Sequence, residues 1–190
     1  SNIARLNLPV KVVQMLDRAD DLTLKGRFTG RISSFHTKGV VGTASGDVGF
    51  EGTMSPDKGE VKNLEAKVAS ASVDLGKILG NKVLGTTGVE VVADGHFGKG
   101  EYDLDVDGVI SRFTLLGYTY DSILAKGRVE NGNVDADVRV QDPNIELDLL
   151  AGLELGSELP TYDVTVDLKK ADLSALQINK RDSVSVLSAN

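Results

Sequence analysis

Acidic residues at alternate positions are the first candidates for chemistry in this sequence. Asp103, Asp105 and Asp107 precede Gly108, which matches the first half of an EF-hand calcium loop. The twelfth position holds Thr114, where such a loop needs a bidentate glutamate. In a strand these carboxylates lie in a row, about 7 Å apart, too far apart to enclose one ion. We therefore predict a solvated strand face and no metal site.

The remaining reactive side chains are few. Ser55 and Lys58 have the Ser-x-x-Lys spacing of serine β-lactamases, but Pro56 between them marks a turn, whereas that serine opens a buried helix. His36 and His96 are the only histidines, and zinc needs three or four convergent ligands. The absence of cysteine removes thiol chemistry. The sequence thus predicts a non-catalytic protein without a cofactor.

Composition narrows the possible partners. The 190 residues are 41% hydrophobic and carry a net charge of −7. Phosphate backbones repel an acidic surface that has no basic stripe, so we expect no nucleic-acid partner. No run of about 18 apolar residues is present, so we expect no membrane-spanning helix in this sequence. From the character of its two ends, we expect the chain to be a segment of a longer protein.

Alternation of apolar and polar residues is the dominant pattern. It runs through residues 102–107, 134–140, 145–149 and 162–168. A period of two indicates strands with one buried face and one wet face, which is typical of antiparallel sheets. Asn131-Gly132 lies between two such segments and predicts a hairpin turn.

Three short segments interrupt the alternation. They are residues 9 to about 18, 74 to about 80, and 172 to about 177. Asp74 and Asp172 are good helix N-caps, and a proline suits the first turn of the earliest segment. We predict a short helix at each place, lying at the junctions between repeated units.

The repeat itself is suggested by three pairs of anchors. Residues 30–35 resemble 108–113, residues 24–28 resemble 93–97, and Asp74-Leu75 returns as Asp172-Leu173. Units that reuse one pattern usually stack into a continuous surface. We expect one contiguous β-repeat segment over residues 1–190, with units at about 9–73 and 74–171 and the start of a third at 172–190.

The alternating strands share a set of aliphatic residues that form the candidate binding surface. They predict either an ordinary closed core or a groove left open for an acyl chain, since both require alternating strands. The residues are Leu104, Val106, Val138, Val140, Leu147, Leu149, Val164 and Val166.

The pattern of a short helix, a polar turn and strands of the L-x-L-x-G-x-F type resembles a known family. It is carried by Asp172-Leu-Ser-Ala-Leu176, Asp74-Leu-Gly-Lys-Ile78, Leu22-x-Leu-x-Gly-x-Phe28 and Lys99-Gly-Glu-Tyr-Asp-Leu104. These segments resemble the AsmA-like superfamily, and within it the TamB-type (translocation and assembly module) proteins of Gram-negative bacteria. The motifs are structural and include no invariant polar site.

This resemblance implies an elongated, strongly twisted antiparallel sheet, the β-taco, with an apolar concave groove. It implies a periplasmic segment of an inner-membrane-anchored protein that moves phospholipid between membranes or helps outer-membrane β-barrels to insert. The partners would be phospholipid acyl chains and an outer-membrane assembly protein. From the residues alone, the alternative fold is a closed β-sandwich, and the alternative function is a structural or adhesive β-domain of a surface protein.

Overall fold

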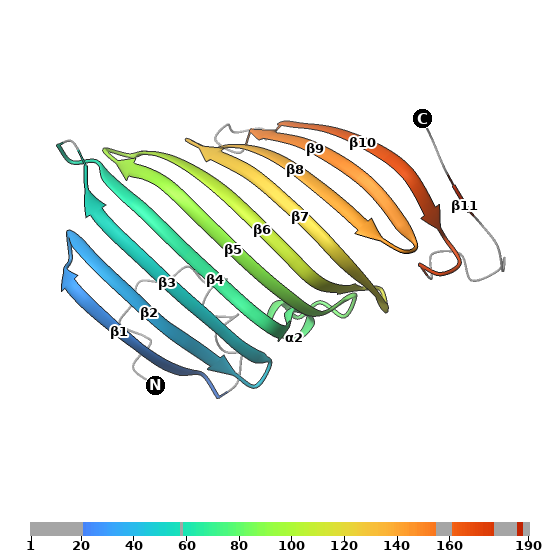
Figure 1. Ribbon diagram of the computed structural model, residues 1–190, viewed down its shortest axis with the longest axis horizontal. Coiled ribbons are helices and arrows are strands. Elements are labelled where there is room, and N and C mark those ends of the chain that lie inside the picture. Colours follow the sequence, from blue (N-terminus) through green and yellow to red (C-terminus); the bar gives the residue numbers. More distant parts are fainter. Residues whose placement is uncertain (1–20, 58, 155–160, 177–185, 188–190) are drawn as a thin grey trace.

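The protein is a single antiparallel sheet whose strands follow one another in chain order (Figure 1). The computed structural model describes residues 21–57, 59–154, 161–176 and 186–187. The strands are β1 (Thr23–Arg31), β2 (Ser34–Thr43), β3 (Gly46–Pro56), β4 (Lys62–Asp74), β5 (Leu84–Gly98), β6 (Glu101–Leu115), β7 (Tyr118–Glu130), β8 (Asn133–Asp142), β9 (Ile145–Glu154), β10 (Thr161–Asp172) and the short β11 (Val186–Leu187), with one helix, α2 (Leu75–Leu79), between β4 and β5.

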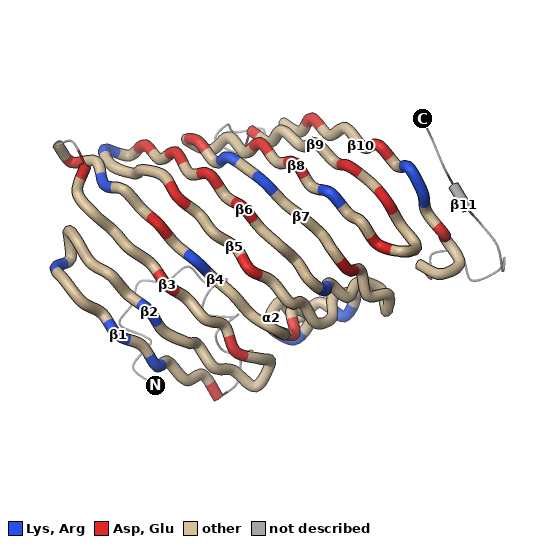
Figure 2. The backbone as a smooth tube through the Cα atoms, in the orientation of Figure 1, with Lys and Arg blue, Asp and Glu red and all other residues tan. Residues whose placement is uncertain are grey.

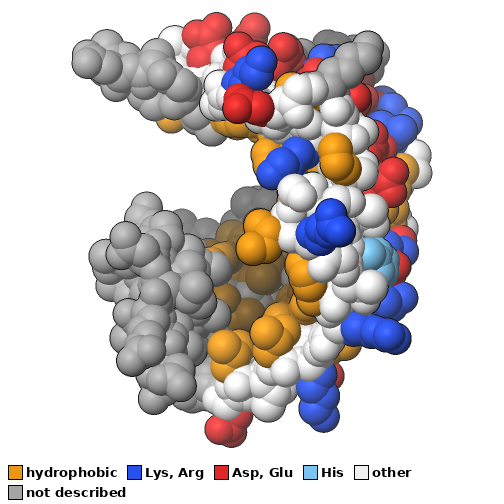
Figure 3. Space-filling model, turned by 90° about the vertical axis from the view of Figure 1, so that its left-hand side faces the viewer, with side chains coloured by type: hydrophobic (Ala, Val, Ile, Leu, Met, Phe, Trp, Pro, Cys, Tyr) orange, Lys and Arg blue, Asp and Glu red, His pale blue; other side chains and the backbone are white. Residues whose placement is uncertain are grey.

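The sheet is open, which confirms the elongated twisted sheet and shows that the closed sandwich is wrong. Among the described residues each strand pairs only with its neighbours in sequence, so β1 and β10 do not close on one another. The sheet bends into a C-shaped cross-section (Figure 3). Register shifts in β4, β5, β6 and β10 contribute to this bend, because a bulge increases local twist and curvature.

Two turns follow the sequence signals. Asn131 and Gly132 have φ angles of 49° and 92° between β7 and β8, the left-handed pair of a type I′ hairpin. Between β3 and β4 the amide of Asp57 donates to the carbonyl of Val61 at 3.0 Å, which closes the β3–β4 hairpin. Ser55 therefore lies at the end of a strand and not at the start of a helix.

The helix expected at residues 74–80 is present as α2. The Asp74 carboxylate accepts a hydrogen bond from the amide of Lys77 at 3.0 Å, as an N-cap does. Gly80 ends the helix with a φ of 66°, the left-handed conformation that glycine adopts without strain. The helix expected over residues 9 to about 18 lies outside the described residues.

The helix expected from Asp172 to about residue 177 lies only partly within the described residues, where the Leu176 amide donates to the Asp172 carbonyl at 3.0 Å. Residues 173–176 form a hydrogen-bonded turn. The Asp172 carboxylate accepts from the amides of Ser174 and Ala175, each at 3.0 Å. A carboxylate that binds amides two and three residues ahead stabilises a turn as well as a helix start, so the cap residue alone does not choose between them.

Asp74 and Asp172 nevertheless occupy corresponding places in the sheet. Each is the last residue of its strand, β4 or β10. The amide of Asp74 donates to Ser45 O at 2.7 Å, and that of Asp172 to Asn144 O at 2.8 Å, both in the preceding hairpin turn. This anchor pair therefore marks equivalent positions. The division of the chain into units of 9–73 and 74–171 stays a prediction.

The anchor pair 30–35 and 108–113 does not mark equivalent positions. Residues 30–35 span the turn between β1 and β2 together with the strand ends on either side of it. Gly30 has a φ of 121° there, and Ile32 is 88% exposed. Residues 108–113 lie inside β6, and Gly108 is in register with Ala125. A glycine followed by β-branched and hydroxyl residues suits both settings, so this motif cannot distinguish a turn from a strand.

Candidate functional site: an apolar groove

The strand register places all eight candidate groove residues on one face of the sheet. Directly paired residues of antiparallel strands point to the same side. Val106 is linked in this way through Gly127, Ala136 and Ala151 to Val164. Parallel rows join the other members, Leu104, Val138, Val140, Leu147, Leu149 and Val166. Their binding of lipid stays a prediction.

This face is the inner, concave side of the sheet. Figure 3 shows hydrophobic side chains along the inside of the C and charged side chains on its outside. The register extends the apolar face across β1 to β5, so that it crosses ten strands. All five phenylalanines and all four tyrosines lie on it: Phe28, Phe35, Phe50, Phe97, Phe113, Tyr102, Tyr118, Tyr120 and Tyr162.

Burial on the concave face is graded, as expected for a groove without a second layer. Ile123 and Val140 are 7% and 8% exposed, because larger neighbours surround them. Val164 and Val166, on β10, are 52% and 55% exposed. Among the described residues no other sheet or helix packs across this face. The aliphatic row therefore passes continuously from covered positions to open ones.

Small residues line the middle of the groove. One row across the strands reads Ala66, Ala93, Gly127, Ala136 and Ala151, apart from Val106 between β5 and β7. Side chains on the inside of a curved sheet converge, so small residues there permit the bend and leave space above the backbone. Larger side chains occupy most of the positions on both sides of this floor.

At the β1–β3 end the floor is formed by glycine beneath an aromatic ring. Gly26, Gly39 and Phe50 lie in one row of the sheet. A methyl group at Gly39 would lie 2.6 Å from the Cζ of Phe50 and 2.6 Å from the carbonyl of Lys25. The ring therefore packs where a side chain of residue 39 would otherwise be, and it covers backbone that glycine leaves bare.

On the concave face, the charged residues of the described strands lie at the two rims of the groove. We call the edge with the β1–β2, β3–β4, β5–β6 and β7–β8 turns the upper rim, and the edge with α2 and the β6–β7 and β8–β9 turns the lower rim (Figure 1). Among the described concave positions of the paired strands, Lys62 at the upper rim and Asp142 at the lower rim are the charged ones. Between them the described concave positions are apolar apart from the hydroxyls of the tyrosines and of Thr37, Ser70 and Thr87.

Asp142 is held in a closed network at the lower rim and is only 7% exposed. Its carboxylate accepts from the Tyr118 hydroxyl and from the amides of Asp121 and Asn144 at 3.0 Å and 2.9 Å. Burial by itself raises the pKa of Asp142, but these hydrogen bonds outweigh it and lower the pKa below its usual value. Asp142 is therefore ionised at neutral pH, and its negative charge belongs to this rim.

The pKa values of the neighbouring tyrosines shift in the opposite direction. Tyr118 and Tyr120 pack edge to face with ring centroids 4.7 Å apart. Burial, together with the Asp142 carboxylate, raises the pKa of both phenols. Both rings thus stay neutral and contribute apolar surface to this end of the groove.

The outer, convex face carries ion pairs between strands, and Figure 2 marks where acidic and basic residues lie along the backbone. Asp148 accepts from Lys169 at 2.6 Å and from Arg139 at 2.8 Å, and these bonds lower the pKa of Asp148. Lys38 pairs with Glu51 at 2.9 Å across β2 and β3. Opposite charges on adjacent strands keep this face soluble while contributing little stability per pair.

The aspartate row of β6 belongs to this convex array. Asp103 pairs with Arg128 at 2.6 Å, and Asp107 with Lys126 at 3.4 Å. Asp105 lies between them and is exposed. In the part of the chain that the structure describes, no group of three acidic or histidine side chains is arranged to hold a metal ion. His36 and His96 also lie apart, with Thr53 and Asn63 as their respective neighbours.

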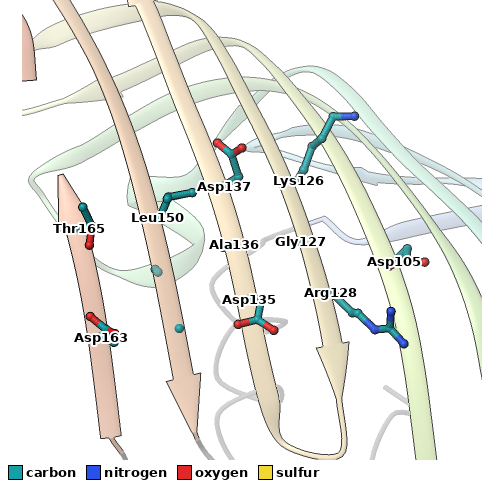
Figure 4. A pocket seen from close by; sticks show the side chains of 12 residues that line it. Asp105, Lys126, Gly127, Arg128, Asp135, Ala136, Asp137, Leu150, Asp163 and Thr165 are labelled. Carbon is teal, nitrogen blue, oxygen red and sulfur yellow. The ribbon is translucent and has the colours of Figure 1, made fainter. Parts of the chain in front are cut away.

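The convex face carries an open depression of about 590 Å³ over β7 to β10 (Figure 4). Lys126 and Arg128 from β7 border it together with Asp135 and Asp137 from β8. The basic groups are already paired with aspartates of β6, and the depression is wide and shallow. It follows from the curvature of the sheet, and the concave groove remains the better candidate site.

Sequence reasoning missed the charged rim residues and the small-residue floor. Asp142-Pro-Asn144 is a turn signature whose carboxylate binds its own backbone, which predicts the local hydrogen bonds but not the tyrosine partner. Lys62 lies two residues before Leu64 and therefore faces the same side, but only if β4 already begins at Lys62. The sequence does not show where this strand begins. The floor depends on cross-strand register, for which no local signal exists.

Comparison of the chain with protein-family models, with curated proteins and with solved structures finds no match. The resemblance to the AsmA-like superfamily therefore stays a prediction from the sequence. Within the described residues, no helix has the length and apolar character needed to cross a membrane.

Proposed function

We propose that the concave face binds the acyl chains of phospholipids, in a non-catalytic protein. The observation that carries this proposal is the separation of the two faces. One continuous apolar surface crosses ten strands, while the charged residues of the described paired strands, apart from Lys62 and Asp142, lie on the other side together with a few aliphatics. Monomeric proteins rarely leave an apolar surface of such extent open to water without a partner for it.

The dimensions of the groove suit an acyl chain. It runs across the strands, and ten strands at a spacing of about 4.8 Å give a length of about 43 Å. The hydrocarbon core of a bilayer is about 30 Å thick, so the chains of one leaflet reach about 15 Å. One lipid would therefore lie across three or four strands, and several would fit along the groove.

The apolar chemistry of the groove suits acyl chains that slide along it. Burial of apolar surface contributes about 25 cal/mol per Å² without any polar recognition. The small residues Gly127, Ala136 and Ala151 leave a smooth floor with no polar side chain to hold one methylene in place. Such a surface binds hydrocarbon strongly and with little preference for position, which is what a conduit requires.

The cellular setting is the part of the proposal that rests on the family resemblance. We propose a periplasmic segment of an inner-membrane-anchored protein that moves lipid between membranes. Its second possible client is an outer-membrane β-barrel during assembly. The experiment below distinguishes acyl binding from a purely structural or adhesive domain, which needs no bound lipid.

The test compares two variants of β8 that add the same side chain to opposite faces. Ala136→Phe fills the groove floor, and Asp137→Phe adds the same ring to the convex face. The purified chain is incubated with phosphatidylglycerol vesicles, separated from them, and examined for bound lipid by native mass spectrometry. We expect Ala136→Phe to lower lipid occupancy at least about tenfold and Asp137→Phe to leave it unchanged.

Thermal melts of both variants show whether folding is retained. Equal loss of lipid in both variants, or absence of lipid on the parent protein, would contradict the proposal. Lipid extracted from protein purified out of bacterial membranes gives an independent measurement. An adhesive or structural domain would carry no stoichiometric phospholipid in that extract.

A further inference from the structure

The two rims of the groove differ in the charge that each places on the described concave face. Lys62 is the cation of the concave face, on the first position of β4, in register with Phe97 and Pro56. Among the described residues it forms no ion pair and no side-chain hydrogen bond. An ammonium group on a long apolar stem extends its charge from an apolar surface toward water. The upper rim therefore presents one available positive charge beside the groove.

The upper rim also exposes aromatic side chains. Phe28 is 56% exposed, Tyr102 37% and Tyr162 68%, and the register puts all three at the upper end of the concave face. Tyrosine at the boundary of an apolar region places its ring against hydrocarbon and its hydroxyl in the polar layer. This combination of exposed aromatics and a lysine is typical of the headgroup level of a membrane.

The lower rim has the opposite character. Its concave charge is Asp142, which the Tyr118 hydroxyl and two backbone amides hold in place. The tyrosines here, Tyr118 and Tyr120, are engaged with this carboxylate and with each other. At the described concave positions of this rim, an approaching anionic group would meet a fixed negative charge and no free cation.

From this asymmetry we propose that the groove binds phospholipid in one orientation, with the phosphate at the upper rim beside Lys62 and the acyl chains lying in the groove. This inference rests on the proposed function and deepens it, because it names the polar part of the ligand and its place. Lys62 supplies the attraction and Asp142 repels the same group from the far rim.

The nearby turns do not create this preference. Among the described residues, the β3–β4 turn carries Asp57 and Glu60, and the β5–β6 turn carries Lys99 next to Glu101. Glu101 pairs with Gly98 and faces the convex side, one position before Tyr102. Lys62 therefore differs from the other rim charges by its place on the apolar face.

The experiment compares two lipids and two lysines of one strand. The lipids are phosphatidylglycerol and diacylglycerol with the same acyl chains, so that they differ only in the phosphate headgroup. Lys62→Gln removes the concave cation, and Lys67→Gln removes a convex lysine of β4 that pairs with Glu90 at 2.7 Å. Native mass spectrometry of the full 190-residue chain gives the occupancy of each lipid.

We expect the parent protein to bind phosphatidylglycerol roughly three- to tenfold better than diacylglycerol, as one partly exposed charge-assisted contact allows. In Lys62→Gln this preference should disappear while diacylglycerol binding stays the same, and in Lys67→Gln it should persist. Binding of both lipids without any effect of Lys62→Gln would overturn the headgroup assignment and leave the proposed function intact. Binding of neither lipid to the parent protein would overturn both.

Discussion

The two faces of this sheet are built from alternating residues of the same strands, yet they obey different rules. On the concave face, the size of a residue decides where it can lie. Glycine and alanine form the floor of the groove, and aliphatic residues occupy most positions beside them. On the convex face, charge decides which side chains are neighbours, and among the described residues ion pairs link five pairs of adjacent strands. A substitution should therefore be costly inside when it changes volume or adds charge, and tolerated outside in both cases.

The largest contrast should come from placing a carboxylate at two positions of the concave face. Val140, 8% exposed, lies between Ile123 and Leu147 and two residues before Asp142. Val140→Asp buries an unpaired charge next to a like charge and should lower the free energy of unfolding by about 3 to 4 kcal/mol in urea titrations.

Val166→Asp provides the matched case, since Val166 is 55% exposed on the same face. Water reaches the new carboxylate there, so unfolding should change by less than about 1 kcal/mol while lipid binding falls. Equal destabilisation by the two variants would indicate that the groove is closed by a further layer.

A second contrast uses glycine on either side of the sheet. A methyl group at Gly39 would meet Lys25 O and the Phe50 ring at 2.6 Å, so Gly39→Ala should cost about 2 to 3 kcal/mol. At Gly49, on the convex face of β3, the nearest atom would be 3.6 Å away, and Gly49→Ala should be neutral or slightly stabilising. Chemical denaturation of the two variants side by side checks this, and a reversed order would refute the ring-over-glycine packing.

The two best-bonded aspartates give a third contrast. Asp142→Ala leaves the Tyr118 hydroxyl and two part-buried backbone amides without this acceptor and should cost about 2 kcal/mol. Asp148→Ala removes an exposed pair with Arg139 and Lys169 and should cost clearly less, because water and salt screen it.

The same contrast has a pH dependence. Since the folded state lowers the pKa of Asp142, its contribution is complete above the unfolded pKa of about 3.9 and is lost as the pH falls through the folded value. The stability difference between the parent protein and Asp142→Ala should therefore shrink only below about pH 4. A difference that shrinks instead on going from pH 6 to pH 8 would contradict this assignment.

The smallest effect is expected in the aspartate row of β6. Asp103 and Asp107 already have basic partners, and Asp105 is exposed between them. Calcium titration by calorimetry should give no micromolar binding, and Asp105→Asn should leave the melting temperature unchanged. Micromolar calcium binding that Asp105→Asn abolishes would show that the convex face has a function of its own.

Sequence alone predicts that the groove residues share one side of the sheet, because alternation is a local property of Leu104, Val106 and the other groove residues. It does not predict whether the apolar side is closed, since a sandwich has the same alternation. The network of Asp142 and Tyr118 joins residues 24 positions apart and requires the register of β7 and β8. The helix cap at Asp74 can be predicted from the sequence, because it joins residues only three positions apart. The same kind of cap at Asp172 is followed by a turn in the described residues.

The strand order, identical to the chain order, has a consequence for how the molecule forms. Nearly all long-range contacts join adjacent strands, so the contact order is low and each new hairpin can add to the edge left by the previous one. Such a chain can acquire structure progressively from one end, without waiting for a distant segment. Its length is also adjustable, because deleting or duplicating a pair of antiparallel strands such as β7 and β8 preserves the direction and facing of every strand that follows.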